Sequence, residues 1–141
     1  MKSEPSEYAI DDLARDGHVA WFGVRNYQAR NFMRDQMHPG DGVLFYHSSC
    51  AEPGIAGLAE VCSAAYPDAT QFDPASDYFD PKSTRESARW DCAEIRYVDT
   101  FTAVVPLEAL RANPDLEGLA LLAKGSRLSV QPVTADEWES F

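Results

Sequence analysis

The sequence predicts an α+β fold that is mainly β: a small, curved, mostly antiparallel sheet or barrel decorated with short α-helices. Three observations support this prediction. Apolar runs of strand length lie between Pro and Gly turns, the helical patterns between them are short, and no regular array of alternating strands and helices is present. The 141 residues suffice for one hydrophobic core, and we expect a single domain over residues 1–141.

Two short helices are expected in the first third of the chain. Ile10 to Arg15 has a helical pattern, and Gly17 follows it where glycine commonly ends a helix. Asn26 is suited to cap a second helix from about Tyr27 to Gln36, because its side-chain oxygen can accept hydrogen bonds from the first helical N–H groups. The Pro- and Gly-containing segment 38–42 then ends that helix.

Two neighbouring strands and a long loop follow. Gly42 to His47 is a buried apolar run, and Ile55 to Ala65 is a second strand that we expect to pair with it across a Pro-Gly turn. The segment from Tyr66 to Ala88 contains three prolines and four aromatic residues. Loops of this length in small domains are either functional or packed by their own aromatic side chains, and we expect packing here.

The last third of the chain predicts strands and short helical turns. These elements are a strand from Trp90 to Phe101 that Thr102 to Leu107 extends, helical turns at Leu107 to Arg111 and Leu116 to Lys124, and a strand from Leu128 to Val133. Thr134 and Glu137 have the spacing of a capping box, which predicts a terminal helix through Trp138.

The composition excludes several classes of protein. With 45% hydrophobic and 25% charged residues the chain resembles soluble globular proteins rather than disordered or fibrous ones. No apolar stretch approaches the length of a membrane span and no signal peptide is evident, so we expect a cytoplasmic protein without membrane contact. Cys50, Cys62 and Cys92 form no C-x-x-C pair and are expected to be reduced thiols.

The charge of the chain restricts its partners. A formal net charge of −11 argues against a protein that neutralises a long track of phosphates. Two stretches nevertheless contain basic and no acidic residues: Gly17 to Arg34, with Arg25, Arg30 and Arg34, and Gly118 to Ala135, with Lys124 and Arg127. If they meet in the fold they form a local cationic mouth for an anion. The alternative is that these side chains pair with Asp and Glu on a solvated surface.

Evidence for catalysis or metal binding is weak in the sequence. His47 and Cys50 supply residue types for a small-molecule enzyme, but their arrangement follows no motif that can be tied to a mechanism. The three histidines and three cysteines are not paired at spacings that would preorganise zinc, and no phosphate-binding glycine motif is present. We therefore expect no catalysis, no metal and no cofactor.

Binding of a flat ligand is better supported. Several aromatic residues alternate with polar ones, as in Trp21 before Arg25 and Asn26, or Tyr46 before His47 and Ser48. Aromatic side chains stack on nucleobases, and polar neighbours can then contact the base edge. The alternative is that these aromatic residues are simply core. A further alternative is a protein-interaction module that uses the loop of residues 66–88 as its contact surface.

Five motifs together carry a resemblance to a known family. They are Lys2-Ser3-Glu4-Pro5, the segment from Trp21 to Asn31, Phe45-Tyr46-His47-Ser48, Ala65-Tyr66-Pro67-Asp68, and Arg127-Leu128-Ser129-Val130-Gln131-Pro132. In these motifs the chain resembles the EVE domain family. The resemblance implies a PUA-like fold, a small β-barrel decorated with short helices and similar to YTH domains.

The resemblance also implies a function, namely non-catalytic recognition of a modified base, flipped out or unpaired, in an aromatic cage. The sequence leaves open whether the nucleic acid is DNA or RNA, and we expect a monomer. Ser3 and Glu4 match the segment that contacts the base in YTH relatives, and Trp21 matches a cage tryptophan, with Trp90 as the second wall. The other residues that fall in family motifs are assigned to the base pocket (Asn26, Tyr46, His47, Ser48, Gln131) or to phosphate contacts (Arg25, Arg30, Arg127). Because a carboxylate such as that of Glu4 accepts well from the exocyclic amine of cytosine, 5-substituted cytosine is the expected base.

Overall fold

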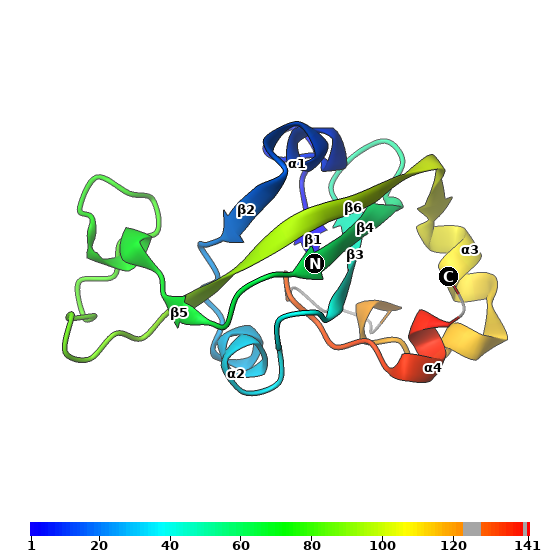
Figure 1. Cartoon of the computed structure of the whole chain (residues 1–141). Helices are drawn as coiled ribbons and strands as arrows, with labels where there is room; N and C mark the ends of the chain where they lie inside the picture. The colour runs from blue at the N-terminus through cyan, green and yellow to red at the C-terminus, as the bar shows by residue number, and fades with distance from the viewer. Residues whose placement is uncertain (123–127, 140) are drawn as a thin grey trace.

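A curled, mixed β-sheet forms the centre of the protein in a computed structural model that describes residues 1–122, 128–139 and 141 (Figure 1). The order of its strands is β1 (Lys2–Ser3), β3 (Gly42–His47), β4 (Gly54–Val61), β6 (Asp91–Pro106) and β2 (His18–Trp21), and β5 (Tyr66–Pro67) pairs with β6 off this path. The pair β1 and β3 is parallel, and the other pairs are antiparallel. The predicted mostly antiparallel sheet is therefore confirmed.

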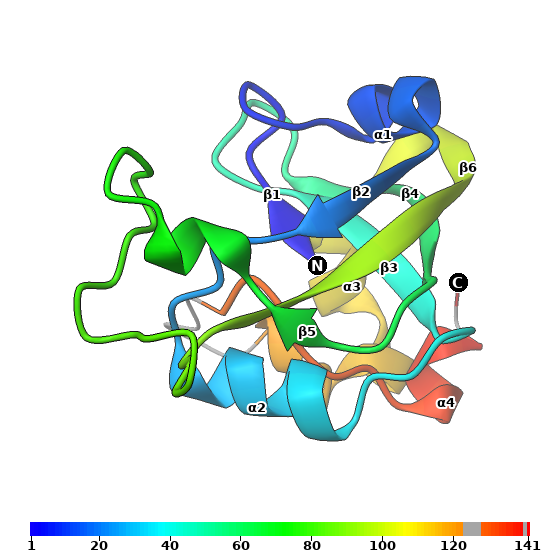
Figure 2. The same ribbon diagram turned by 60° about the vertical axis from the view of Figure 1, so that its left-hand side comes forward.

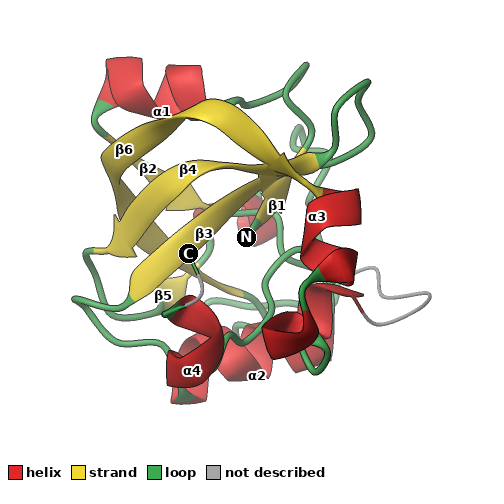
Figure 3. Cartoon of the chain, turned by 90° about the vertical axis from the view of Figure 1, so that its right-hand side faces the viewer, coloured by secondary structure: helices red, strands yellow, loops and turns green. Residues whose placement is uncertain are grey.

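The sheet curls because its long strands bend. β6 is 16 residues long and pairs with β2, β4 and β5 along its length. The β4 to β6 register shifts between Ile55 and Gly57 and again between Leu58 and Ala59, and such bulges bend a strand and increase its twist. Gly57 has no space for a side chain, since a Cβ there would collide with the backbone oxygen of Asp99. Figure 3 shows the strands crossing one another as the sheet curls into a half-barrel.

Short helices cover the sheet. They are α1 (Ile10–Asp16), α2 (Tyr27–Asp35), α3 (Leu107–Ala112) and α4 (Ala135–Trp138), with 3₁₀ turns η1 (Ala69–Phe72), η2 (Pro114–Leu116) and η3 (Ala120–Leu122). In Figures 1 and 2, α1 lies across one end of the sheet and α2 across the other. None of the helices in the described ranges has the length and apolarity that crossing a membrane requires.

The helix ends follow local chemistry, as predicted. Gly17 ends α1 with φ of 81°, a conformation that favours glycine, and its N–H donates to the Leu13 carbonyl. The side chain of Asn26 accepts from the N–H groups of Gln28 and Ala29 at 2.9 and 3.2 Å, and so begins α2. Thr134 forms the expected capping box at α4.

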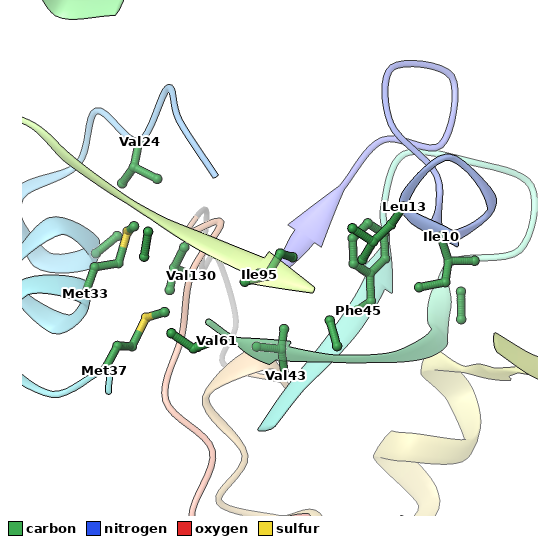
Figure 4. Packing of buried hydrophobic residues seen from close by; sticks show 14 residues of the cluster. Ile10, Leu13, Val24, Met33, Met37, Val43, Phe45, Val61, Ile95 and Val130 are labelled. Atoms are coloured by element: carbon green, nitrogen blue, oxygen red, sulfur yellow. The ribbon is translucent and has the colours of Figure 1, made fainter. Parts of the chain in front are cut away.

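Two clusters of buried side chains pack against the sheet. The larger one joins the two helices across the sheet, and Figure 4 shows Ile10 and Leu13 of α1 beside Phe45, with Met33 of α2 at the other end. The smaller one contains Leu44 together with α3 and η2 residues. Because successive side chains of β3 point to opposite faces, the run from Val43 to Tyr46 is buried on both sides.

Three predicted elements differ from the structure. Residues 128–133 are not a strand: the Lys2 N–H donates to the Ser129 carbonyl at 2.8 Å, but Pro132 has no N–H with which to extend a ladder. β4 ends at Val61 rather than Ala65, and the expected helix 116–124 is replaced, within the described residues, by 3₁₀ turns around Gly118. β2 was not predicted, because four residues are too few for a clear alternating pattern.

The loop of residues 66–88 is not packed by its own aromatic side chains as expected, because Tyr66, Tyr78 and Phe79 are 38–39% exposed. A buried amide holds its base instead. The side chain of Gln71 is fully buried. Its nitrogen donates to the carbonyls of Asp68 and Trp90 at 2.7 Å, and its oxygen accepts from the N–H groups of Arg89 and Trp90 at 3.0 Å. These bonds close the base of a loop that projects from the body in Figure 2.

Replacing Asn26 tests the helix cap. We expect Asn26→Ala to lower the free energy of unfolding by about 1 kcal/mol, because two N–H groups of α2 lose their acceptor. Gln28→Ala, an exposed change in the same helix, is the control and should stay within about 0.5 kcal/mol of wild type. Chemical denaturation measures both, and equal effects of the two changes would contradict the cap.

Candidate functional site

A cavity of about 580 Å³ opens between the two edge strands of the curled sheet. Lys2 and Ser3 of β1 line one side, and Val19 to Trp21 of β2 line the other. The remaining lining residues are Glu4, Glu7, Tyr8, Phe22, Gly23, Ser48, Ser49, Tyr78 and Ser129. We name this cavity the seam pocket. Its volume lies in the range of sites for small ligands.

Four residues predicted for base binding meet in the seam pocket: Ser3, Glu4, Trp21 and Ser48. Trp21 is half-buried, and its ring meets that of Phe45 edge-on at 5.7 Å, so the core fixes its position. The Ser3 hydroxyl donates to the Tyr8 carbonyl at 2.7 Å, which leaves its lone pairs to accept. Glu4 is exposed and carries a carboxylate at the pocket.

The backbone brings these groups together from distant parts of the chain. The Ser48 N–H donates to the Ser3 carbonyl at 2.9 Å, which places the end of β3 beside β1. Ser49 follows with φ of 52°, the one positive φ at a non-glycine residue among those described. This turn directs Ser48 and Ser49 to the pocket rather than along the strand.

The sequence interpretation missed three aromatic residues of the seam pocket: Tyr8, Phe22 and Tyr78. Phe22 is 50% exposed and Tyr78 is 38% exposed, and their rings meet edge-on at 5.8 Å. The aromatic content of the loop was a signal that Tyr78 had a role. Nothing in the sequence indicated that its ring would lie beside a pocket built from β1 and β2.

Arg25, expected to bind phosphate, is instead used inside the protein. Its five N–H donors all have acceptors: the Tyr78 carbonyl at 2.7 and 3.0 Å, the Thr70 hydroxyl at 3.0 Å, the Val24 carbonyl at 2.9 Å and the Asp68 carboxylate at 3.1 Å. The expectation of a phosphate contact is corrected, because no N–H of Arg25 is left to donate.

Asp68 is the buried partner of Arg25, with a side chain 1% exposed. Burial alone would raise the pKa of this carboxyl, but hydrogen bonds from Thr70, Gly23 and Arg25 outweigh burial and hold the pKa below its usual value. The Gly23 N–H donates to Asp68 at 2.8 Å. The ionised carboxylate therefore connects the end of β2 to the loop.

Trp90 does not line the seam pocket, and its expected place as the second wall is corrected. It is 6% exposed, its ring stacks on that of Tyr27 at 4.7 Å, and its indole N–H donates to Asp80 at 2.7 Å. The Arg25 guanidinium lies 5.5 Å from the centre of the Trp90 ring. Trp90 therefore anchors the loop rather than facing a ligand.

Four other predicted residues also lie outside the seam pocket. Asn26 caps α2, and Arg30 donates to the Arg89 carbonyl at 2.7 Å with its guanidinium 4.6 Å from the centre of the Tyr27 ring. Tyr46 and Gln131 line a small cavity of about 30 Å³, room for about one water molecule. Arg127, like Lys124, lies outside the described residues, so the expected meeting of the two basic stretches stays a prediction.

His47 anchors helix α1 rather than lining the seam pocket. Its Nε2 accepts the N–H of Ile10 at 3.1 Å, and a neutral imidazole is required for this bond. Burial lowers the pKa of His47, with Asp11 opposing the shift. The lone pair that a base would need to activate Cys50 is therefore already occupied by the Ile10 N–H.

Two other depressions of similar volume have different linings. One of about 680 Å³ lies between β6 and the C-terminal turns, and one of about 660 Å³ lies between α2 and α4. Neither contains Ser3, Glu4, Trp21 or Ser48. All three contain carboxylate, hydroxyl and aromatic side chains, but the seam pocket has four aromatic residues where each of the others has two. Because it also contains these four predicted residues, it is the candidate site.

The chain is similar to several known proteins over nearly its whole length. A family model of the EVE domain matches residues 1–141. Human thymocyte nuclear protein 1 is 37% identical over 158 aligned residues, covering 99% of this chain and 69% of the human protein. A Pseudomonas syringae protein of known structure is 54% identical with a TM-score of 0.94, covering 99% of this chain and 93% of that one.

A further crystal structure contains a ligand. Human THYN1 protein in complex with 5-methylcytosine-containing DNA has a TM-score of 0.92 at 36% identity, and the match covers 99% of this chain and 92% of that one. Its fold is the same mainly β, PUA-like half-barrel with few short helices. The fold class expected from the sequence is thereby confirmed.

The contact between His47 and Ile10 predicts a pH dependence of stability. Because the folded protein lowers the pKa of His47, the unfolded chain binds the proton more readily. The free energy of unfolding should therefore fall as pH decreases from about 7 through the unfolded value near 6.5, and level off below the folded value. Chemical denaturation in steps from about pH 8 to 5 measures this change.

A variant pair isolates the contribution of His47. In His47→Gln this part of the pH dependence should disappear, whereas exposed His18→Gln should keep it. The buried amino group of Met1, whose pKa burial lowers to about 5, adds a dependence of the same sign, so only the difference between variants is informative. An unchanged pH profile in His47→Gln would contradict the assignment.

Proposed function

The chain belongs to the EVE domain family, and on that premise we propose that it is a non-catalytic nucleic-acid-binding module that takes one modified base into the seam pocket. The observation that carries the proposal is the meeting of Ser3, Glu4, Trp21 and Ser48 around one cavity. These residues come from three separate segments of the chain, and each lies in a motif that the resemblance assigns to base binding. The similarity to human THYN1, which binds 5-methylcytosine-containing DNA, supports the same ligand class.

The chemistry of the pocket favours 5-substituted cytosine. The indole of Trp21 offers a flat surface on which a base can stack, worth about 1–3 kcal/mol per base. The carboxylate of Glu4 can accept from the exocyclic amine of cytosine, and the hydroxyls of Ser3 and Ser48 can complete the edge contacts. A methyl group at position 5 adds apolar surface that the aromatic residues can cover.

The charges around the pocket fit a partner held mainly by one nucleotide. The basic side chain among the lining residues is that of Lys2, and the acidic ones are those of Glu4 and Glu7. Because Arg25 is engaged internally and the net charge is −11, we expect few phosphate contacts. We infer an unpaired or flipped-out nucleotide as the partner, because a base inside a duplex cannot enter a pocket.

The two alternatives from the sequence are less well supported. An enzyme that uses His47 and Cys50 needs a free base, but His47 accepts the Ile10 N–H. A protein-interaction module that uses loop 66–88 has to account for the contribution of the same loop to the seam pocket through Tyr78. A base-binding function is compatible both with the bond between His47 and Ile10 and with the place of Tyr78 in the pocket.

A binding comparison tests the proposed ligand. Fluorescence anisotropy with short single-stranded DNA and RNA containing one cytosine, 5-methylcytosine, 5-hydroxymethylcytosine or N6-methyladenine measures preference at a single position. We expect the 5-substituted cytosines to bind most tightly. Equal affinity for modified and unmodified strands would contradict modified-base recognition.

Removing the stacking surface should abolish tight binding. We expect Trp21→Ala to weaken binding of the 5-methylcytosine strand by about 5- to 150-fold, the range of one lost stacking contact. Phe141→Ala is the control, since Phe141 is 38% exposed but lies outside the pocket. Circular dichroism confirms that both variants fold. Normal binding by folded Trp21→Ala would exclude the pocket as the site.

Salt dependence reports the number of phosphate contacts. On single strands each contact contributes a slope of about −0.7 in a plot of log affinity against log salt. We expect a total slope no steeper than about −1.5, corresponding to one or two contacts. A slope of about −4 or steeper would indicate a protein that follows the phosphate backbone instead.

A further inference from the structure

We propose that Tyr78 is the second aromatic wall of the seam pocket and that Arg25 is its positioning residue. The inference rests on the proposed function and gives Tyr78 a contacting role and Arg25 a positioning role that the sequence interpretation did not assign. Tyr78 takes the place that the sequence interpretation assigned to Trp90.

The position of the Tyr78 ring is defined by the backbone of Gly23. Both residues line the seam pocket. A Cβ placed on Gly23 would lie 2.8 Å from the Tyr78 ring, a separation that real Cβ atoms essentially never show. Gly23 also has φ of 81°, a conformation that favours glycine. The ring therefore rests directly on the backbone at Gly23, two residues after the end of β2.

Arg25 holds the backbone that carries this ring. Its Nε and Nη2 groups both donate to the Tyr78 carbonyl, at 3.0 and 2.7 Å, and its guanidinium lies 5.7 Å from the centre of the Tyr78 ring. On its other side it lies 5.5 Å from the centre of the buried Trp90 ring. The guanidinium thus connects the exposed wall residue to an anchored one.

Asp68 completes the arrangement from the opposite side. Its Oδ2 accepts from Gly23 at 2.8 Å and from Arg25 at 3.1 Å, while its Oδ1 accepts from the N–H of Thr70 at 2.8 Å and from the Thr70 hydroxyl. The ion pair between Arg25 and Asp68 therefore fixes two groups: the Gly23 backbone, on which the Tyr78 ring rests, and the Tyr78 carbonyl. Lysine cannot replace this planar fork of donors.

This assignment separates Arg25 from a phosphate-binding role. A positioning residue affects a free nucleoside and an oligonucleotide equally, because its effect passes through the base pocket. A phosphate contact affects the oligonucleotide only, because a nucleoside has no phosphate. The two roles therefore predict different results with the same variant.

The experiment measures binding of 5-methyl-2′-deoxycytidine by NMR titration and of a 5-methylcytosine oligonucleotide by anisotropy. We expect Tyr78→Ala and Arg25→Lys each to weaken both ligands by a similar factor, about 5- to 100-fold. Tyr78→Phe, which retains the ring, should bind nearly as wild type. Arg30→Lys is the matched control and should leave nucleoside affinity unchanged, since Arg30 does not line the pocket.

A double variant tests whether Arg25 acts through Tyr78. If it does, Arg25→Lys combined with Tyr78→Ala weakens nucleoside binding no more than Tyr78→Ala alone. Because Arg25→Lys could disturb folding, its melting temperature is compared with that of Tyr78→Ala, which leaves the ion pair intact and tests the wall independently.

Three outcomes would overturn the inference. Wild-type nucleoside affinity in folded Tyr78→Ala excludes Tyr78 as a wall. Weaker oligonucleotide binding with unchanged nucleoside binding in Arg25→Lys makes Arg25 a phosphate contact. Failure of the wild-type protein to bind either ligand overturns the proposed function itself, and is distinguished from the other two because it requires no variant.

Discussion

A sheet that curls without closing is the constraint on which the rest of the structure depends. Edge strands carry backbone groups without sheet partners, and proteins keep such edges short or covered. Here the two ends of the strand order are two residues long in β1 and four residues long in β2. Their residues line opposite parts of one cavity. Direct pairing of β1 with β2 would fill this gap with hydrogen bonds, so the pocket exists because the half-barrel stays open.

The edge strands build one part of the seam pocket, and the ion pair between Arg25 and Asp68 holds the loop that carries Tyr78. Arg25 and Asp68 are 22% and 1% exposed, and burying charges costs free energy unless hydrogen bonds compensate for the lost water. All five N–H donors of Arg25 and both oxygens of Asp68 have partners, so the pair meets that condition. The basic stretch from Gly17 to Arg34 suggested phosphate binding. One of its three arginines, Arg25, instead holds the loop of residues 66–88 through Asp68 and Tyr78.

Elements set by neighbouring residues were predicted well. Asn26, Gly17 and Thr134 mark helix ends at the predicted positions, because capping depends on hydrogen bonds within a few residues. The buried strand from Gly42 to His47 was also predicted from its apolar run. The prediction of a strand at residues 128–133 was wrong, because an apolar pattern alone does not supply a pairing partner.

For the site, the chain by itself determined which residue types were available and which segments carried them, including Ser3, Glu4, Trp21 and Ser48 of the seam pocket. Only the tertiary structure decided that Tyr78 joins them, that Trp90 is buried beside Tyr27, and that Arg25 bonds to the Tyr78 carbonyl. The physical reason is separation: Arg25 and Tyr78 are 53 positions apart, and such contacts depend on how the sheet curls and where the loop closes. Local hydrogen bonds are encoded within a few residues, whereas a pocket wall requires the whole fold.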